Sequence, residues 1–174
     1  MSGVDGLRTP EPESSARRRE RDSWTAELLD LEAGRIGVPV LDRGEIRTLL
    51  GTSPRIAIIG ASPNPMRPSH GVLVDLLALG YDVVPVNPTA GEVAGLRCYP
   101  SLRAAVDATG PVDIVDVFRL SPACPEHARE AVDVGAHCLW LQLGIASREA
   151  GRIARDGGLT VVMNRCLAVE AARL

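Results

Sequence analysis

The sequence predicts an α/β fold with a parallel sheet, and three features of the chain support this prediction. Short apolar runs such as Ile56–Ile59 contain no polar side chain, so both faces of such a strand must be buried. These runs alternate with longer segments of helical character. Several of the helical segments end at a glycine, for example at Gly80 and Gly135. This alternation is typical of β-α-β units, which build a doubly wound, Rossmann-like sheet.

The expected elements follow one another along most of the chain. Strands are expected at 56–59, 81–86, 96–99, 112–117, 138–141 and 160–163. Helices are expected at 23–33, 42–50, 68–79, 101–108, 122–134, 147–156 and 167–174. Residues 1–22 are rich in Pro, Ser, Glu and Arg, and we expect a disordered tail there. The chain therefore divides into this tail, a helical N-terminal extension at 23–50 and a Rossmann domain at 51–174.

The composition excludes several classes of function. All 19 basic residues are arginine, which excludes a Walker-type phosphate loop, pyridoxal enzymes and Schiff-base aldolases, because each needs a lysine. A net charge of −3 and an aromatic content of 3% argue against nucleic-acid binding. Without a signal peptide or a membrane-spanning apolar run, a cytoplasmic protein with no membrane contact is expected. The four cysteines and three histidines match no zinc spacing, so no metal site is expected.

The turn after the first strand has the features of a phosphate site. Gly60 allows a sharp turn and close approach of a ligand to the backbone. The next helix begins near Pro68, and its free N–H groups and dipole favour an anion. Ser62 adds a hydroxyl donor, and Arg67 adds a cation that can bind a pyrophosphate at two points. These features predict a nucleotide ligand.

The end of the second strand bears on which nucleotide binds. NAD-binding domains place an Asp or Glu there to hold the ribose 2′-hydroxyl. This chain has Asn87-Pro88 instead, which offers no carboxylate and disfavours NAD. NADP remains an alternative, with Arg97 or Arg119 near its 2′-phosphate.

Further candidate residues follow the fourth and fifth strands. Phe118 and Arg119 end one strand, and Gln142 and Gly144 follow the other. Because parallel strands end at the same edge of a sheet, these side chains should line one crevice with the phosphate turn. Phe118 can pack against adenine, Arg119 can pair with a phosphate, and Gln142 can hydrogen-bond amide groups of the ligand.

Taken together, these motifs resemble those of the small bacterial CoA-binding proteins. That family is similar to the CoA-binding domain of the succinyl-CoA synthetase α subunit and of ADP-forming acyl-CoA synthetases. The resemblance covers about residues 40 to 174, on the segments Ile58–Pro63, Arg67–Ser69, Gly80–Tyr81, Pro85–Pro88, Val115–Arg119, Trp140–Gly144 and Met163–Cys166. It implies a three-layer α/β/α Rossmann fold with strand order 3-2-1-4-5-6 and a coenzyme A site at the carboxyl edge of the sheet.

The resemblance also implies a role for each matching residue. The phosphates would be held by residues of the first turn: Gly60, Ala61, Ser62 and Arg67. The adenosine would be flanked by Asn87 and Pro88. The crevice would be closed by Phe118, Arg119, Gln142 and Gly144. The sequence departs from the family where glycine, tyrosine and aspartate are usual, at Met66, His70 and Asn164.

No catalytic residue is expected. In the synthetase α subunits the phosphorylated histidine lies on a second domain, which would begin where this sequence stops at Leu174. His127 and His137 have no acid or nucleophile at a recognisable spacing. Cys166 follows an arginine, which can activate a thiol, but a buried structural cysteine is the preferred interpretation.

The leading hypothesis is therefore non-catalytic binding of coenzyme A or acyl-CoA. Two alternatives stay open: an NAD(P)-binding, oxidoreductase-type domain, and a stand-alone subunit of an acyl-CoA ligase that needs a separate catalytic subunit. A homodimer and a partner enzyme subunit are both compatible with the sequence, which does not indicate the acyl group.

Overall fold

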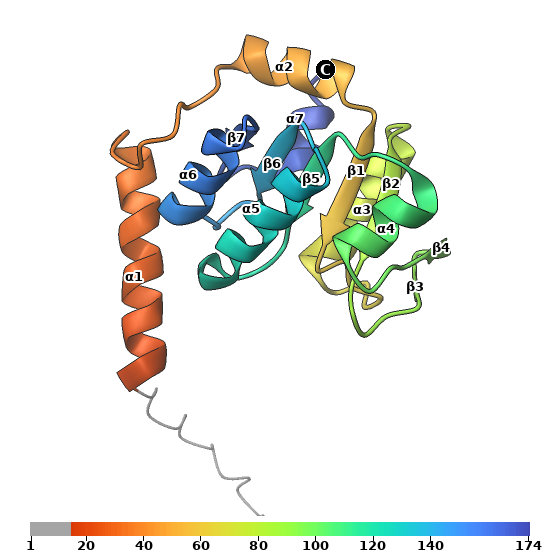
Figure 1. Ribbon diagram of the computed structural model, residues 1–174, viewed down its shortest axis with the longest axis horizontal. Coiled ribbons are helices and arrows are strands. Elements are labelled where there is room, and N and C mark those ends of the chain that lie inside the picture. Colours follow the sequence, from red (N-terminus) through yellow and green to blue (C-terminus); the bar gives the residue numbers. More distant parts are fainter. Residues whose placement is uncertain (1–14) are drawn as a thin grey trace, which may run out of the picture.

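A five-stranded parallel sheet forms the middle layer of the protein, in a computed structural model that describes residues 15–174. Its strands are β1 (Arg55–Ile59), β2 (Asp82–Val86), β5 (Ile114–Val117), β6 (Cys138–Leu141) and β7 (Thr160–Val162). They lie in the order β2-β1-β5-β6-β7, and all neighbours are parallel (Figure 1). All four residues of β5 and of β6 are buried, as a strand covered on both faces requires, although β5 includes Asp116.

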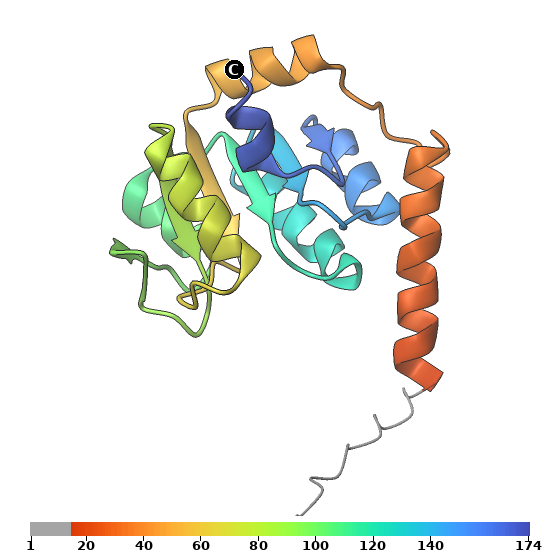
Figure 2. The same ribbon diagram turned by 180° about the vertical axis from the view of Figure 1, so that it is seen from behind.

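Helices cover both faces of this sheet and complete three layers (Figure 2). One face carries α4 (Leu102–Thr109), α5 (Cys124–Asp133) and α6 (Arg148–Asp156), and the short 3₁₀ helix η1 (Ser121–Ala123) leads into α5. The other face carries α3 (Pro68–Ala78), α7 (Leu167–Ala171) and the buried side of α2 (Arg43–Thr52). A separate cluster of buried apolar residues lies on each face. The predicted Rossmann-like α/β/α fold is confirmed.

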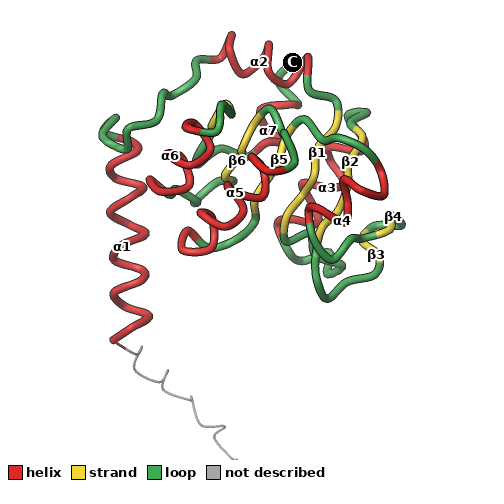
Figure 3. Tube along the Cα trace, in the orientation of Figure 1, coloured by secondary structure: helices red, strands yellow, loops and turns green. Residues whose placement is uncertain are grey.

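The third expected strand, at 96–99, is much shorter than predicted. Its first residues form β4 (Leu96–Arg97), which pairs antiparallel with β3 (Glu92–Val93) in a small separate sheet, drawn as short segments of a long loop in Figure 3. Only Tyr99 reaches the main sheet, through one parallel bridge to Val86. Tyr99 N donates to the Pro85 carbonyl at 3.0 Å and the Tyr99 carbonyl accepts from Asn87 N at 2.8 Å, but Pro85 has no N–H with which to extend this ladder to the residues before Tyr99. The segment that ends at Tyr99 nevertheless lies beside β2, where the third strand was predicted.

The N-terminal extension is longer than predicted. Helix α1 runs from Ser15 to Glu32, so residues 15–22 are helical instead of belonging to the expected tail. The reason is local, since alanine, arginine and glutamate in this stretch are good helix formers. The prediction for residues 1–14 lies outside the described residues. α1 stands beside α6, and a connecting segment, residues 33–42, leads from it to α2 (Figures 1 and 2). This segment is called the strap below.

The helices that follow β1 and β5 pack on opposite faces of the sheet. β1 and β5 are neighbours, yet α3 follows β1 onto one face and α5 follows β5 onto the other. Adjacent parallel strands whose helices diverge leave a crevice at their carboxyl ends, where ligands of such sheets bind. No helix in residues 15–174 has the length and apolar character needed to cross a membrane.

Candidate functional site

Gly60 begins the turn that follows β1 and can only be a glycine. Its φ angle is +83°, in the left-handed region. A Cβ atom at this position would lie 2.8 Å from the backbone oxygen of Phe118. The turn after β1 therefore lies directly against the end of β5, and the chain brings Gly60, Phe118 and Arg119 together as predicted.

Two side chains fix the direction of the backbone beyond Gly60. Asn87 Nδ2 donates to the carbonyl of Ala61 at 2.7 Å. His70 Nδ1 lies 2.9 Å from the carbonyl of Ser62 and must donate, because a carbonyl can only accept. The C=O and N–H of a trans peptide point in opposite directions, so holding the Ala61 carbonyl turns the Ser62 N–H away from Asn87. Asn87 therefore holds the backbone of the predicted phosphate turn in this conformation.

The amino end of α3 is not capped by a side chain. Arg67 occupies the N-cap position without a side-chain cap, and Pro68 is the first helical residue. Across residues 15–174, no hydrogen bond is made by the backbone N–H of Ala61, Ser62 or Ser69. The Ser62 hydroxyl accepts from Asn64 N at 3.2 Å, which leaves its own hydrogen for a ligand. These groups form a set of donors suited to an anion.

Two arginines flank these donors. Arg67 and Arg119 are both exposed, and neither forms an ion pair with any described residue. An arginine without a protein partner can turn its planar guanidinium toward two phosphate oxygens at once. Both guanidinium groups are therefore available to pair with a phosphate of a ligand.

Gln142 is buried at the end of β6 and held by Asp116. Its Nε2 donates to Asp116 Oδ2 at 2.8 Å. Burial raises the pKa of the Asp116 carboxyl to about 8, and the hydrogen bond from Gln142 opposes that shift only in part. Within the described chain the other amide atom, Gln142 Oε1, accepts no hydrogen bond, so it can accept one from a ligand N–H.

Gly144 shapes the loop after β6. Its φ angle is +80°, and its N–H donates to Asn164 Oδ1 at 2.8 Å. Its carbonyl accepts from Trp24 Nε1 of α1 at 2.6 Å. Asn164, at a φ of +54°, does here what an aspartate would do, since only an accepting oxygen is needed. Both polar groups of Gly144 are thus used within the protein.

A cavity of about 530 Å³ lies at this edge of the sheet, next to the first turn of α3. It is lined by Trp24, Pro68, Val72, Phe118, Arg119, Leu120, Ser121, Gln142, Leu143, Gly144, Ile145 and Cys166. Four of the predicted crevice residues, Phe118, Arg119, Gln142 and Gly144, belong to this lining. Pro88 is exposed and does not line the cavity.

The family model described as CoA binding domain matches residues 54–172. The chain belongs to the CoA-binding domain family. Within it, the chain is 38% identical over 130 residues to the uncharacterized protein YneT of Bacillus subtilis (strain 168), covering 75% of this chain and 94% of that protein. The relationship suggested by the sequence motifs is confirmed.

Solved structures agree with this CoA-binding domain assignment. A hypothetical protein from Pyrococcus horikoshii OT3 has 40% identity and a TM-score of 0.73, covering 77% of this chain and 92% of that chain. The dinucleotide-forming acetyl-coenzyme A synthetase 1 of Ca. Korarchaeum cryptofilum has 25% identity and a TM-score of 0.54. This similarity covers 66% of the present chain and only 27% of the synthetase, so it relates the domain to one part of a larger enzyme.

Trp24 is one of several cavity residues that sequence reasoning missed, together with Val72, Leu120, Ser121 and Ile145. Trp24 lies on α1, outside the CoA-binding domain match that begins at residue 54, and 120 positions separate it from Gly144. No spacing rule connects residues so far apart. The one available signal was the scarcity of aromatics, with only two tryptophans in the chain.

His127 and His137 each lie beside an acidic residue, although their sequence spacing had indicated no such neighbour. His127 Nδ1 lies 2.7 Å from Glu130, one helical turn along α5, and His137 Nδ1 lies 3.4 Å from Asp113. Neither pair lines the cavity. Because these pairs stand apart from the open amides of the phosphate turn, they provide no acid–base group there.

The cysteines divide into three buried thiols and one at the cavity. Cys98, Cys124 and Cys138 are buried, and burial raises the pKa of Cys124 to about 12 and that of Cys138 still further. Such thiols are poor nucleophiles. Cys166 is half-buried and lines the cavity, so it is more accessible than the buried structural cysteine that was expected.

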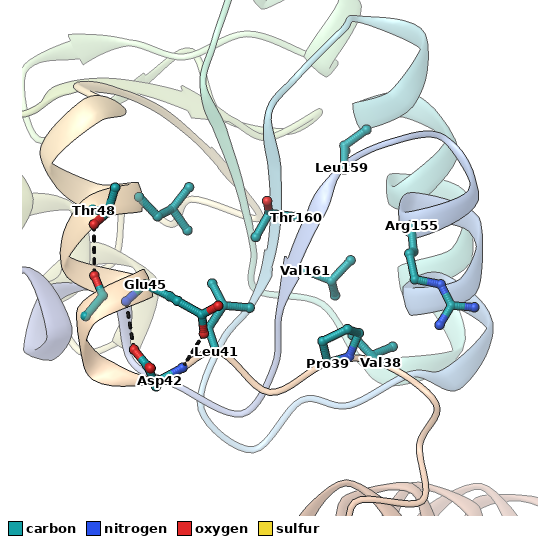
Figure 4. A pocket seen from close by; sticks show the side chains of 12 residues that line it. Val38, Pro39, Leu41, Asp42, Glu45, Thr48, Arg155, Leu159, Thr160 and Val161 are labelled. Atoms are coloured by element: carbon teal, nitrogen blue, oxygen red, sulfur yellow. Dashed lines mark hydrogen bonds between the residues drawn. The ribbon is translucent and has the colours of Figure 1, made fainter.

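A second cavity, of about 730 Å³, lies between the start of β7 and the strap that connects α1 to α2 (Figure 4). Its polar groups bond to one another: Asp42 and Glu45 form the capping box of α2, and Thr48 Oγ1 donates to the Gly44 carbonyl. Arg155 donates to the Gly37 carbonyl of the strap. These bonds stabilise the N-terminal extension, and the cavity is remote from the phosphate turn.

Proposed function

We propose that the domain binds coenzyme A or an acyl-CoA at the crevice between β1 and β5, without covalent chemistry of its own. The diphosphate would lie against the turn after β1, with the adenosine toward Asn87 and Pro88. The pantetheine would follow the cavity, where Gln142 Oε1 can accept from an amide N–H of the ligand.

The observation that carries this proposal is the set of unpartnered N–H groups at Ala61, Ser62 and Ser69, next to two unpaired arginines. Amides at a helix amino end and free guanidinium groups are how proteins bind phosphate.

Isothermal titration calorimetry with coenzyme A, dephospho-CoA, NAD and NADP tests the proposal. We expect coenzyme A to bind more tightly than dephospho-CoA, because the 3′-phosphate adds a charge for arginine to contact. Equal or tighter binding of NAD or NADP would contradict the proposal and favour a dinucleotide site.

Substitution of one arginine locates the ligand. Arg67→Ala should weaken coenzyme A binding roughly tenfold to a hundredfold, the value of a charge-assisted hydrogen bond of about 1.5–3 kcal/mol. Arg103→Ala is the matched control, because Arg103 is an exposed arginine of α4 that pairs with Asp107. Equal effects of both substitutions would place the phosphates elsewhere.

A further inference from the structure

The cavity extends beyond the phosphate turn to a wall formed by the N-terminal helix. Its lining includes Pro68, the first residue of α3, which follows the open amides of the turn after β1, and Trp24 of α1. With the diphosphate at those amides, the rest of the ligand enters the cavity that Trp24 borders.

The position of Trp24 is fixed by several contacts. Trp24 Nε1 donates to the Gly144 carbonyl at 2.6 Å. Asp30 of the same helix pairs with Arg148 at 2.6 Å, and Glu27 accepts from the Arg148 backbone N–H at 3.2 Å. Leu28 packs against the core. α1 is therefore docked on the loop after β6 and on α6, and the wall is part of the folded molecule.

Most of the cavity lining is apolar. Two large apolar side chains at the cavity are strongly exposed, Leu120 at 64% and Leu143 at 68%. Phe118 and Val72 add further apolar surface. Exposed leucines beside a ligand cavity lose contact with water when an apolar group covers them, which is favourable.

The charges near Trp24 discriminate among such groups. An adjoining cavity of about 370 Å³ shares Trp24 and Ser121 with the first and carries Glu27 and Glu149. Glu149 pairs with Arg129 at 3.2 Å, so Glu27, which forms no ion pair with a described residue, is the carboxylate that disfavours a negatively charged ligand group. Arg119, the cation of the main cavity, lies against the position of Gly60 and so belongs to the phosphate end.

Ser121 offers a polar contact at the same place. It borders both cavities, and its Oγ is buried with no hydrogen-bond partner in the described part of the chain. A thioester carbonyl would supply the acceptor that this hydroxyl lacks, whereas a free thiol would not.

We infer that the cavity takes the uncharged acyl group of a CoA thioester, with Trp24 as its outer wall. This inference rests on the proposed function and names the ligand class of that site. It assigns a binding role to α1, which lies outside the family match.

Calorimetry of the full chain with coenzyme A, acetyl-CoA, hexanoyl-CoA and succinyl-CoA tests the inference. Each buried methylene contributes about a fourfold gain in affinity, so hexanoyl-CoA should bind at least tenfold more tightly than coenzyme A. Succinyl-CoA should bind more weakly than hexanoyl-CoA. Equal binding of coenzyme A and hexanoyl-CoA would overturn the inference and leave the proposed function standing, whereas no binding of either would overturn both.

Variants of α1 and η1 locate the acyl group. Trp24→Ala should lower hexanoyl-CoA affinity at least tenfold and leave coenzyme A affinity within twofold, while Trp24→Phe should keep most of the preference. Ser121→Ala should weaken the binding of all three thioesters but not that of coenzyme A. Leu29→Ala, at an exposed position of α1, is the control. Unchanged hexanoyl-CoA binding by a Trp24→Ala protein with wild-type circular dichroism would show that Trp24 is not the wall.

Discussion

Asp116 is the only buried carboxyl group in the described part of the chain. It lies in the middle of β5, where its register partners are Ile58 and Trp140. One oxygen accepts from Gln142 and the other has no partner within residues 15–174. An isolated carboxylate is costly to bury, so the proton is retained and the pKa rises to about 8. The residue contributes to the site by holding Gln142.

We therefore predict that Asp116→Asn reduces the pH dependence of stability. An unfolded aspartate releases its proton near pH 4, whereas folded Asp116 keeps its proton up to about pH 8. The contribution of Asp116 is thus fully present below pH 4 and is lost as pH rises to 8, by at most about 1.4 kcal/mol per pH unit. Urea unfolding at pH 5 and pH 7.5 should show the variant gaining stability relative to the wild type.

The control for this prediction is Asp107→Asn, a change of the same kind at an exposed position of α4. Its stability difference from the wild type should stay flat over the same range. An Asp116→Asn difference that is constant between pH 5 and pH 7.5 would contradict the buried, protonated state.

The helices differ in whether a side chain caps their first turn. α2, α4 and α6 each begin with a side-chain cap, from Asp42, Ser101 and Ser147 respectively. α3, α5 and α7 have none, and the residues just before α3 leave amides open at the predicted phosphate turn. A capped start adds stability, and an open start leaves donors available for an anion.

The capping box of α2 yields a prediction about the N-terminal extension. Asp42 accepts from Glu45 N at 2.9 Å, and Glu45 accepts from Asp42 N at 2.8 Å. Asp42→Ala should lower the free energy of unfolding by about 1 kcal/mol in urea titrations. Arg43→Ala, the adjacent change, should stay within about 0.5 kcal/mol of wild type. Similar losses for the two variants would mean that the box adds nothing to stability.

At the scale of the molecule, the site combines stretches that are far apart in sequence. The turn after β1 and the ends of β5 and β6 meet because parallel strands end at one edge, and α1 then adds a wall. A ligand held by several elements stabilises the whole fold, because it binds only when all of them are in place.

Coenzyme A should therefore raise the melting temperature. At a hundred times its dissociation constant a ligand adds about 2.7 kcal/mol, which corresponds to roughly 5–11 °C for a domain of this size. Differential scanning calorimetry over a thousandfold range of coenzyme A measures this shift. A melting temperature that does not change with ligand concentration would contradict binding to the folded domain.

The sequence by itself determined the α/β class and the alternation of strands and helices. Local signals decide both: apolar runs with both faces buried, and glycines where the chain must turn. The order of the strands in the sheet was implied by the family resemblance, and the phosphate turn stays a prediction. The sequence also placed Phe118, Arg119 and Gln142 correctly at the cavity, because the carboxyl ends of parallel strands must meet.

Only the tertiary structure decided what the side chains do there. Asn87 and Gly144 have their polar groups bonded within the protein, to Ala61 and Thr89 and to Asn164 and Trp24. Trp24 reaches the cavity because α1 packs beside α6, a contact between distant segments that no local pattern encodes. Residue types reveal which hydrogen bonds are available, but the packing of separate elements decides which are used and which remain for a ligand.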